Sequence, residues 1–213
     1  LVTCDDQDRV LQNVNLHAQN GVIDYIGDLA PAADETLDGS GMAVYPGLIN
    51  THHHLYQILT RNLPQVQGLA LFDWLTALYG IWKNLTAEGV YASSAAGMGE
   101  LAKYGCTTVF DHHYVFPQNA GDLLAAQFQA AADVGVRLVA SRGSMSLSQK
   151  DGGLPPDSVV QPVDTILRDS QRLVETYHDP APYAMRQIAL APCSPFSVTE
   201  TLMAQTANLA RAL

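Results

Sequence analysis

The sequence predicts an α/β protein, and two observations lead to this prediction. From residue 46 onward, four short apolar segments alternate with longer segments of helical spacing, a rhythm typical of parallel strands joined by helices. Each apolar segment also ends in polar residues, which is where (β/α)8 barrels build their sites. No Gly-x-Gly-x-x-Gly turn follows the first segment, so a TIM-type barrel is favoured over an open doubly wound sheet. Four strands make the first half of such a barrel.

Residues 1–45 have a different pattern, of strands and turns. The strands are expected at residues 10–16, 22–27 and 42–45. Gln19-Asn20-Gly21 is a hairpin signal between the first two. We interpret residues 1–45 as the N-terminal part of a small β domain, a β-sandwich segment too short to fold alone. Residues 46–213 are then the first four β/α units of a barrel.

Within residues 46–213, the expected strands alternate with helices, and several of the helix ends have recognisable capping residues. The strands are expected at residues 46–51, 106–110, 136–141 and 187–191. The helices are expected at residues 69–82, 86–104, 119–134, 163–177 and 197–213. Thr86 is suited to begin the second helix, and Gly105 and Gly135 to end the second and third. Ser197 and Glu200 have capping-box spacing, which predicts that the last helix begins at Ser197.

The first of these strands, Pro46-Gly47-Leu48-Ile49-Asn50-Thr51, ends in three consecutive histidines. In an extended chain alternate side chains share a face, so His52 and His54 are expected to point together and His53 away. Two imidazoles on one face suit a divalent metal such as zinc, which binds His nitrogens at about 2.0–2.1 Å. A core histidine with exposed neighbours is the alternative, but a His-x-His pair that closes an apolar strand favours the metal site.

Composition and charge exclude several classes of protein. The 213 residues are 47% hydrophobic and 15% charged, which indicates a globular protein with a sizeable core. The formal net charge of −10 argues against a nucleic-acid surface, because such surfaces carry clustered Lys and Arg. No apolar run reaches the roughly 18 residues of a membrane span, and the start does not have a signal-peptide pattern. Three scattered cysteines without a Cys-x-x-Cys pair favour reduced thiols and a cytoplasmic location.

A family resemblance rests on the stretch Pro46-Gly47-Leu48-Ile49-Asn50-Thr51-His52-His53-His54-Leu55-Tyr56-Gln57. This stretch resembles the amidohydrolase superfamily, in its branch of mononuclear-metal aminohydrolases and chlorohydrolases that act on nitrogen heterocycles. The similarity extends from Gly21-Val22-Ile23-Asp24-Tyr25-Ile26-Gly27 to Ala191-Pro192-Cys193-Ser194-Pro195, and so covers nearly the whole chain. Arg142-Gly143-Ser144-Met145, with the later Gly152-Gly153-Leu154-Pro155-Pro156, is most similar to the 8-oxoguanine deaminases of that branch.

The resemblance implies a hydrolase acting on C–N bonds other than peptide bonds, with one divalent metal held in part by His52 and His54. Zinc is favoured over iron. The metal would activate water for attack on the amine-bearing ring carbon of a heterocyclic base such as 8-oxoguanine, with release of ammonia. The family's other ligands and its catalytic Glu, His and Asp belong to the fifth and later strands. They are therefore expected beyond Leu213 in a longer enzyme, and no catalytic residue is assigned within the chain.

Four further side chains are candidates for substrate binding. Gln57 follows the histidines, and its amide can both donate to and accept from a purine edge; a loop hydrogen bond is the alternative. Arg142 ends the third strand, where its guanidinium can hold a ring carbonyl; a structural salt bridge is the alternative. His113 and Cys193 end the second and fourth strands, where each can line the pocket. For Cys193, a buried inert thiol is the favoured interpretation.

Two other functions stay open at this point. Within the same class, the enzyme would be a triazine chlorohydrolase or aminohydrolase, or a deaminase of another purine or pyrimidine. In a different class, the chain would be a non-catalytic metal-binding fragment. The expected partner is a small heterocyclic substrate, with no nucleic acid and no membrane. A homo-oligomer and a monomer are both compatible with the acidic composition.

Overall fold

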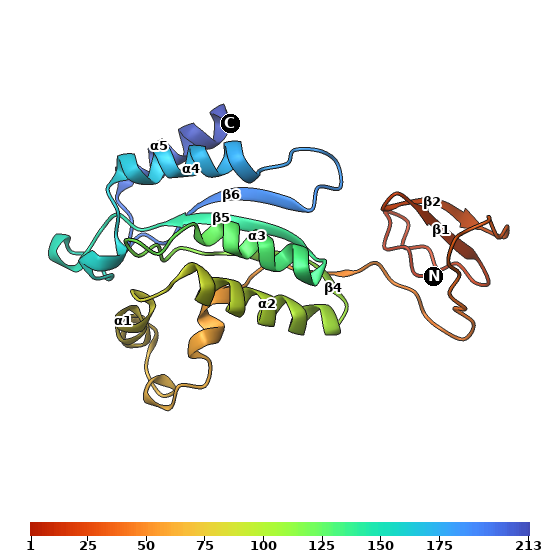
Figure 1. Ribbon diagram of the computed structural model, residues 1–213, viewed down its shortest axis with the longest axis horizontal. Helices are drawn as coiled ribbons and strands as arrows, with labels where there is room; N and C mark the ends of the chain where they lie inside the picture. Colours follow the sequence, from red (N-terminus) through yellow and green to blue (C-terminus); the bar gives the residue numbers. More distant parts are fainter. The chain divides into compact units, whose positions relative to one another are not determined.

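The computed structural model describes residues 1–213 and divides them into two compact units, Leu1–Gly47 and Leu48–Leu213. Figure 1 labels the helices and strands in chain order. The sequence predicted a division between residues 45 and 46, close to the observed one. Pro46 and Gly47 belong to the first unit, and the second unit begins with the first strand of its parallel sheet.

The first unit is built on one β-hairpin. Strands β1 (Asn15–Gln19) and β2 (Val22–Gly27) pair antiparallel in a two-stranded sheet. They are joined by Asn20 and Gly21, which both have positive φ, 53° and 78°. Positive φ at both central positions is the type I′ geometry, which Asn-Gly adopts readily and which matches the twist of the flanking strands. The predicted hairpin is therefore confirmed.

Two other strand predictions for the first unit were wrong. Residues 10–16 were expected to be extended, but β1 begins only at Asn15, because Asn13 has a φ of 53° that interrupts an extended chain. Residues 42–45 form no strand. Val44 accepts one hydrogen bond from the Val2 N–H at 2.9 Å, and Val2 forms an isolated bridge with Val10. A β-sandwich arrangement for this unit stays a prediction.

The second unit contains the predicted parallel sheet. Its strands are β3 (Leu48–Asn50), β4 (Cys106–Asp111), β5 (Arg137–Ser144) and β6 (Arg186–Pro192). They lie in the order β3-β4-β5-β6, and each neighbouring pair is parallel. Strands adjacent in the sheet are thus also consecutive in the chain, as in successive units of a (β/α)8 barrel. The prediction of an α/β fold with a parallel sheet is confirmed.

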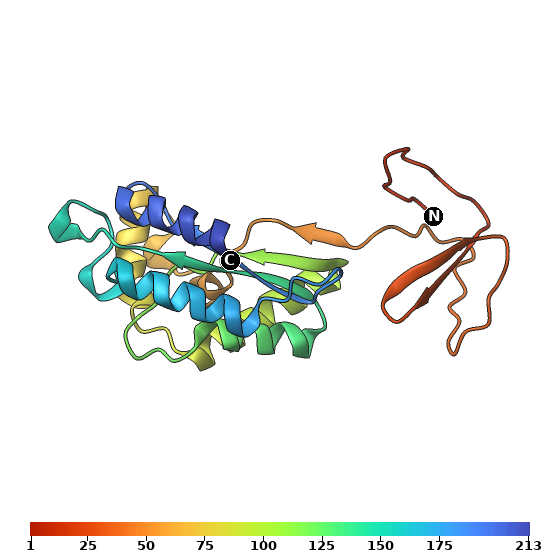
Figure 2. The same cartoon turned by 90° about the horizontal axis from the view of Figure 1, so that it is seen from above.

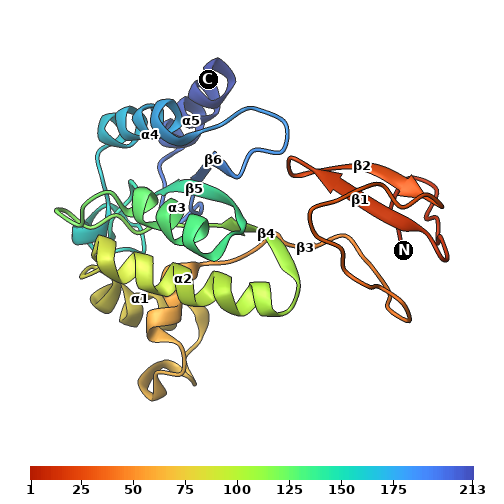
Figure 3. The same ribbon diagram turned by 45° about the vertical axis from the view of Figure 1, so that its right-hand side comes forward.

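Five α-helices accompany the sheet. They are α1 (Leu71–Trp82), α2 (Ala87–Lys103), α3 (Leu123–Val134), α4 (Val163–Tyr177) and α5 (Glu200–Ala212). A 3₁₀ helix, η1 (Leu55–Thr60), follows β3 directly, and shorter ones are η2 (Pro64–Val66), η3 (Gln149–Asp151) and η4 (Asp157–Val159). Figure 2 shows α4 running along the strands, and Figure 3 shows α3 beside α2 and α5 beside α4. No helix combines the length and the apolar character needed to cross a membrane.

The helix boundaries follow from local capping. Thr86 caps α2 as predicted, because its Oγ1 accepts from the Gly89 N–H at 3.1 Å. The predicted start of α3 at Asn119 was wrong: Asn119 has a φ of 62°, and Asp122 caps the helix instead. The predicted start of α5 at Ser197 was also wrong, since Thr199 is the cap.

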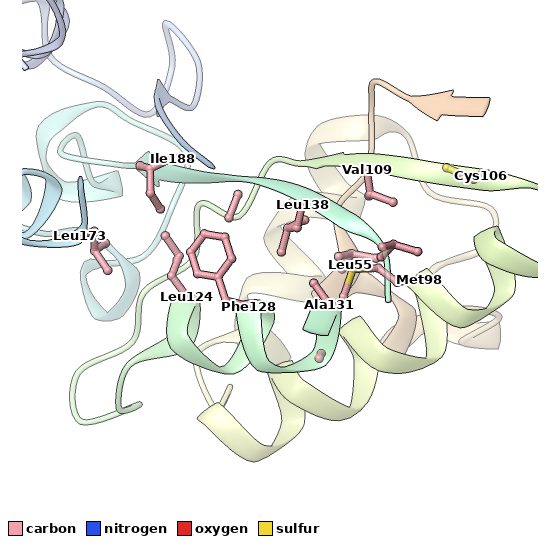
Figure 4. Packing of buried hydrophobic residues seen from close by; sticks show 13 residues of the cluster. Leu55, Met98, Cys106, Val109, Leu124, Phe128, Ala131, Leu138, Leu173 and Ile188 are labelled. Atoms are coloured by element: carbon pink, nitrogen blue, oxygen red, sulfur yellow. The ribbon is translucent and has the colours of Figure 1, made fainter. Parts of the chain in front are cut away.

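The hydrophobic core lies between the sheet and the helices that cover it. Leu124 and Phe128 of α3 point toward the strands that carry Val109 and Leu138, as Figure 4 shows. Leu55 belongs to the same cluster and is fully buried. Since Leu55 directly follows the third histidine, the core anchors the segment that carries the candidate metal ligands.

Candidate active site

His52 and His54 lie together just after β3. Their ring centroids are 5.1 Å apart and the rings are nearly perpendicular, at 84°. His53 lines the same cavity and is partly buried, and the expectation that its side chain points away from those of His52 and His54 stays a prediction. His52 is exposed, whereas His54 is partly buried. The strand therefore delivers two imidazoles to one place at its carboxyl end.

A main-chain carbonyl orients His54. Its Nδ1 lies 2.7 Å from the oxygen of His112, and because a carbonyl can only accept, Nδ1 carries the proton. Nε2 is then left with a lone pair, which is the arrangement found in metal-binding histidines. Burial is the main cause that lowers the pKa of His54 to about 4. The ring is therefore neutral at pH 7, as a metal ligand must be.

The donor set fits a divalent metal of the zinc type. A neutral imidazole with its second nitrogen fixed by a carbonyl is a first-row metal ligand, and His54 provides one beside His52. The chain contains no group of three or more His, Cys, Asp or Glu side chains placed to hold a metal. Within these 213 residues, the side chains available to such a centre are therefore the neighbouring imidazoles of His52 and His54.

Strand β4 ends at Asp111 and is followed by His112 and His113, which the structure places in opposite surroundings. The ring of His112 lies 5.4 Å from the ring of His54 and donates from Nε2 to the Ala191 carbonyl at 3.1 Å. His113 is fully buried, donates from Nε2 to the Val115 carbonyl at 2.9 Å, and has a pKa lowered to about 3 by burial. The pocket role of His113 stays a prediction, and the structure places it in the core.

His112 is the site neighbour that sequence reasoning missed. Val109 and Asp111 are buried on the helix side of the sheet, where Asp111 contacts α3. Strand alternation then places His113 on the same side and His112 on the other. The alternation of side chains along the strand, counted from the apolar Val109, would have predicted that His112 faces the site.

A cavity of about 460 Å³ opens beside the histidines. It is lined by His52, His53, His54, Gln57, Ile58, Thr60, Arg61, Asn62, Gln67 and Trp74. Gln57 lies on η1, and its Nε2 is 3.4 Å from the Tyr114 hydroxyl. Such a contact leaves the amide oxygen of Gln57 free to accept a hydrogen bond. Of the four predicted substrate contacts, the structure brings Gln57 into the same cavity as the histidines.

Cys193 lies in a different cavity. Its N–H donates to the Ser144 carbonyl at 3.0 Å, which continues the ladder between β5 and β6. Its surroundings form a cavity of about 440 Å³ lined by Pro192, Cys193, Ser194, Pro195, Val198, Glu200 and Met203. Burial raises the pKa of the thiol, so it is protonated at neutral pH. A substrate contact by Cys193 stays a prediction.

Arg142 is fully buried, and polar partners surround its guanidinium. Nε donates to Asp169 Oδ2 at 2.8 Å, Nη2 donates to Gln161 Oε1 at 2.7 Å, and Nη1 contacts the Gly143 carbonyl. The guanidinium carbon also lies 3.8 Å from the centre of the Phe116 ring. Burial lowers the pKa of Arg142 to about 10, so it remains charged. These contacts match the alternative interpretation of Arg142, that of a structural salt bridge. A substrate contact by Arg142 stays a prediction.

Replacing Asp169 with alanine is expected to destabilise the protein by about 3 kcal/mol, because the charge of the buried Arg142 would be left without its carboxylate. The free energy of unfolding in urea measures this. Lys150→Ala is the matched control: Lys150 pairs with Asp157 at 3.0 Å, but both side chains are more than half exposed. That change should leave the free energy of unfolding nearly unchanged, because a solvent-exposed pair contributes little. Equal costs for the two variants would contradict the prediction.

Asp111 and Gln127 form a fully buried polar pair next to residues 52–55, which we call the histidine segment. Asp111 Oδ2 accepts from Gln127 Nε2 at 2.6 Å, and Asp111 Oδ1 accepts from the Leu55 N–H at 2.6 Å. Burial raises the pKa of Asp111 to about 7, although both hydrogen bonds favour the ionised carboxylate. The folded protein therefore binds a proton at Asp111 more tightly than the unfolded chain does.

Replacing Asp111 with asparagine is expected to remove a pH-dependent loss of stability. The pKa of Asp111 is about 7 in the folded state and near the ordinary 3.8 in the unfolded state. The contribution of this group to the free energy of unfolding should thus fall as the pH rises from about 4 to about 7, with a slope of up to about 1.4 kcal/mol per pH unit. Urea unfolding of both proteins across this range measures the difference. Parallel pH profiles would contradict the prediction.

Comparisons with known proteins show to which family the chain is similar. The model of the amidohydrolase family matches residues 43–213. The chain is 47% identical over 180 residues to an 8-oxoguanine deaminase of Pseudomonas aeruginosa, covering 84% of this chain and 40% of that protein. It is 37% identical over 227 residues to a hydroxydechloroatrazine ethylaminohydrolase of Pseudomonas sp. (strain ADP), covering 100% of this chain and 47% of that protein.

A solved structure has the same fold as this chain. The atrazine chlorohydrolase of Arthrobacter aurescens TC1, complexed with zinc, superposes with a TM-score of 0.92 at 34% identity, covering 99% of this chain and 49% of that one. The chain thus spans half or less of the length of these relatives. With a family match over most of its residues and a fold shared with a zinc-containing relative, the chain belongs to the amidohydrolase family.

Proposed function

We propose that the protein to which this chain belongs is a metal-dependent hydrolytic deaminase of a nitrogen-heterocyclic base, and that 8-oxoguanine is its substrate. The observation that carries the proposal is the pair His52 and His54, with His54 Nδ1 held by the His112 carbonyl at 2.7 Å. Support for the substrate comes from the relative that is 47% identical and named an 8-oxoguanine deaminase. We further propose that the metal is zinc, which the superposed chlorohydrolase contains.

In the proposed reaction, one water molecule replaces the exocyclic amine of the ring. The ring carbon forms a bond to oxygen, its bond to nitrogen breaks, and ammonia leaves. A divalent metal held by His52 and His54 would supply a nucleophile at neutral pH, because metal coordination lowers the pKa of water to about 7. We propose that the first unit, residues 1–47, belongs to a small β domain of the same protein.

The side chains of this chain would bind and orient the base. Gln57 lines the cavity beside the histidines, and its amide offers one donor direction and one acceptor direction to the edge of a ring. Trp74 lines the same cavity and offers an aromatic surface to a planar base. His112 keeps His54 in a single tautomer through its carbonyl. Together these groups would set the position of the amine-bearing carbon relative to the metal.

A triazine hydrolase is the second candidate function. It is favoured by the superposition on atrazine chlorohydrolase, with a TM-score of 0.92, and by the similarity to hydroxydechloroatrazine ethylaminohydrolase. Both reactions use the same attack of water on a ring carbon and differ in the group that leaves. The contacts made by the ring substituents therefore decide between them.

A product assay tests the proposal. The full-length protein loaded with zinc is expected to release ammonia from 8-oxoguanine faster than from guanine or isoxanthopterin. Triazines bearing chloride or an alkylamine provide the comparison, with chloride and amine measured separately. Turnover of triazines without ammonia release from any purine would reverse the ranking. No release from either class by zinc-loaded protein would refute the enzymatic proposal.

A further inference from the structure

The end of β4 holds three consecutive residues of the histidine segment. The His53 carbonyl accepts from the His112 N–H at 2.8 Å, and His54 Nδ1 donates to the His112 carbonyl at 2.7 Å. The Leu55 N–H donates to Asp111 Oδ1 at 2.6 Å. The first two contacts use the main chain of His112, so any residue except proline at that position keeps them. The third contact depends on the side chain of Asp111.

Both carboxylate oxygens of Asp111 have partners, and neither faces the cavity of the histidines. Oδ1 binds Leu55, and Oδ2 accepts from Gln127 Nε2 at 2.6 Å. Asp111 and Gln127 have no exposed surface, and neither residue lines the cavity. The side chain of Asp111 therefore reaches the site only through the backbone of Leu55, the residue after His54.

This contact replaces a helix cap that the sequence does not provide locally. Leu55 is the first residue of η1, and the preceding His54 makes no capping hydrogen bond with its side chain. An imidazole that is to bind metal cannot also cap a helix with the same nitrogen. Without Asp111 the buried Leu55 N–H would have no acceptor, and a buried donor left unpaired is costly.

We propose that Asp111 is a positioning residue of the metal centre: its carboxylate, fixed by Gln127, holds the main chain at Leu55 and thereby sets the direction of the His54 side chain. This inference rests on the proposed metal centre at His52 and His54. A carboxylate in a core is costly to bury, and the raised pKa of Asp111 reflects that cost. Fixing a ligand at a metal centre requires an acceptor at this place, which an apolar side chain of similar size cannot provide.

Zinc affinity of the full-length protein, measured by competition with a chelator, tests the inference. Asp111→Ala is expected to weaken zinc binding by roughly 10- to 100-fold, the usual effect of losing an outer partner of a ligand. Asp111→Asn should stay within about threefold, because its amide oxygen still accepts from Leu55 and Gln127 can turn its own oxygen toward the new NH₂. If asparagine restores the zinc affinity that alanine loses, residue 111 acts as a hydrogen-bond acceptor and its negative charge is not required.

A stability control accompanies these variants. Leu202 is fully buried on α5 among Ile166 and Val198, with no contact to the histidine segment. Leu202→Ala should lower the urea midpoint of unfolding and leave zinc affinity unchanged. Should Asp111→Ala fail to fold, Gln127→Met provides the test of the inference instead. It removes only the hydrogen bond to Asp111 Oδ2 and is expected to weaken zinc binding about 3- to 10-fold.

A second readout needs no metal. In zinc-free protein, the Leu55 amide is expected to exchange its hydrogen at least about tenfold faster in Asp111→Ala than in the wild type, because it has lost its acceptor. Unchanged exchange, unchanged zinc affinity in Asp111→Ala or in Gln127→Met, or an equal loss of affinity in Leu202→Ala would each overturn the role of Asp111. A wild-type protein that binds no zinc, or a His52→Ala/His54→Ala double variant that still binds it, would overturn the metal centre itself and this role with it.

Discussion

Replacing His54 with alanine in the full-length protein is expected to abolish stoichiometric metal binding and to reduce turnover by at least about a thousandfold. His54 is neutral at pH 7, because burial lowers its pKa to about 4, and its Nδ1 is committed to the His112 carbonyl. Its Nε2 is therefore ready to coordinate. Loss of the metal would return the pKa of water from about 7 toward 15.7, which removes the nucleophile at neutral pH. His52→Ala should have the same effect.

Two other histidines provide the controls for this prediction. His17 lies in the first unit, where its Nδ1 contacts Asp24 at 2.6 Å, so His17→Ala should keep the metal content of the wild type. His53→Ala should also keep the metal, since the alternation of an extended chain points its side chain away from those of His52 and His54. Metal content measured by atomic emission on purified proteins separates the variants. Loss of metal in His53→Ala with retention in His52→Ala would show that the ligands were assigned to the wrong face.

The parallel sheet and most helix ends could be predicted because local physics determines them. Apolar strands separated by helical segments have few ways to bury their faces, and a parallel sheet covered by helices is the main one. Thr86 and the Asn20-Gly21 turn act on their own neighbours in sequence, so their conformations follow from residue type alone. His52 and His54 could be paired for the same reason, because two-residue alternation is local.

The contacts that surround the site could not be predicted, because they join distant parts of the chain. Asp111 meets Leu55 across 56 residues, and Arg142 meets Asp169 across 27. No pattern in the sequence says that the guanidinium of Arg142 would turn to α4 rather than to the substrate. The choice of His113 rather than His112 as a candidate is different. The alternation that paired His52 with His54 also applies to the end of β4, and it would have singled out His112 as the residue beside His54.

The start of α5 shows how a tertiary contact overrides a local signal. Ser197 and Glu200 have the spacing of a capping box, yet the Ser197 carbonyl accepts from the N–H groups of both Ser146 and Leu147. Ser197 is thus part of a turn against the segment after β5, and the helix begins two residues later at the Thr199 cap. The competing caps differ little in intrinsic strength, so two hydrogen bonds from another segment are enough to choose between them.

Replacing Gly143 with alanine is expected to destabilise the protein by about 3 kcal/mol, the cost of forcing a methyl group into a packed backbone contact. Gly143 lies in β5 against the segment after β4, and its N–H donates to the His113 carbonyl at 2.8 Å. A Cβ there would clash with that carbonyl and lie 2.6 and 2.7 Å from Tyr114 Cβ and Cα. Since a carbonyl and a Cα cannot turn away as a side-chain tip can, the 113–114 segment must move.

The same substitution should weaken metal binding, because the displaced segment directly follows His112, whose carbonyl orients His54. Gly99→Ala is the matched control: Gly99 lies inside α2 with no atom within 4 Å of a new Cβ, so alanine should be neutral or stabilise the protein by up to about 1 kcal/mol. Urea unfolding gives both stabilities, and chelator competition gives both metal affinities. If the two variants behaved alike in both measurements, the close approach of Gly143 to residues 113–114 would not explain the glycine at this position.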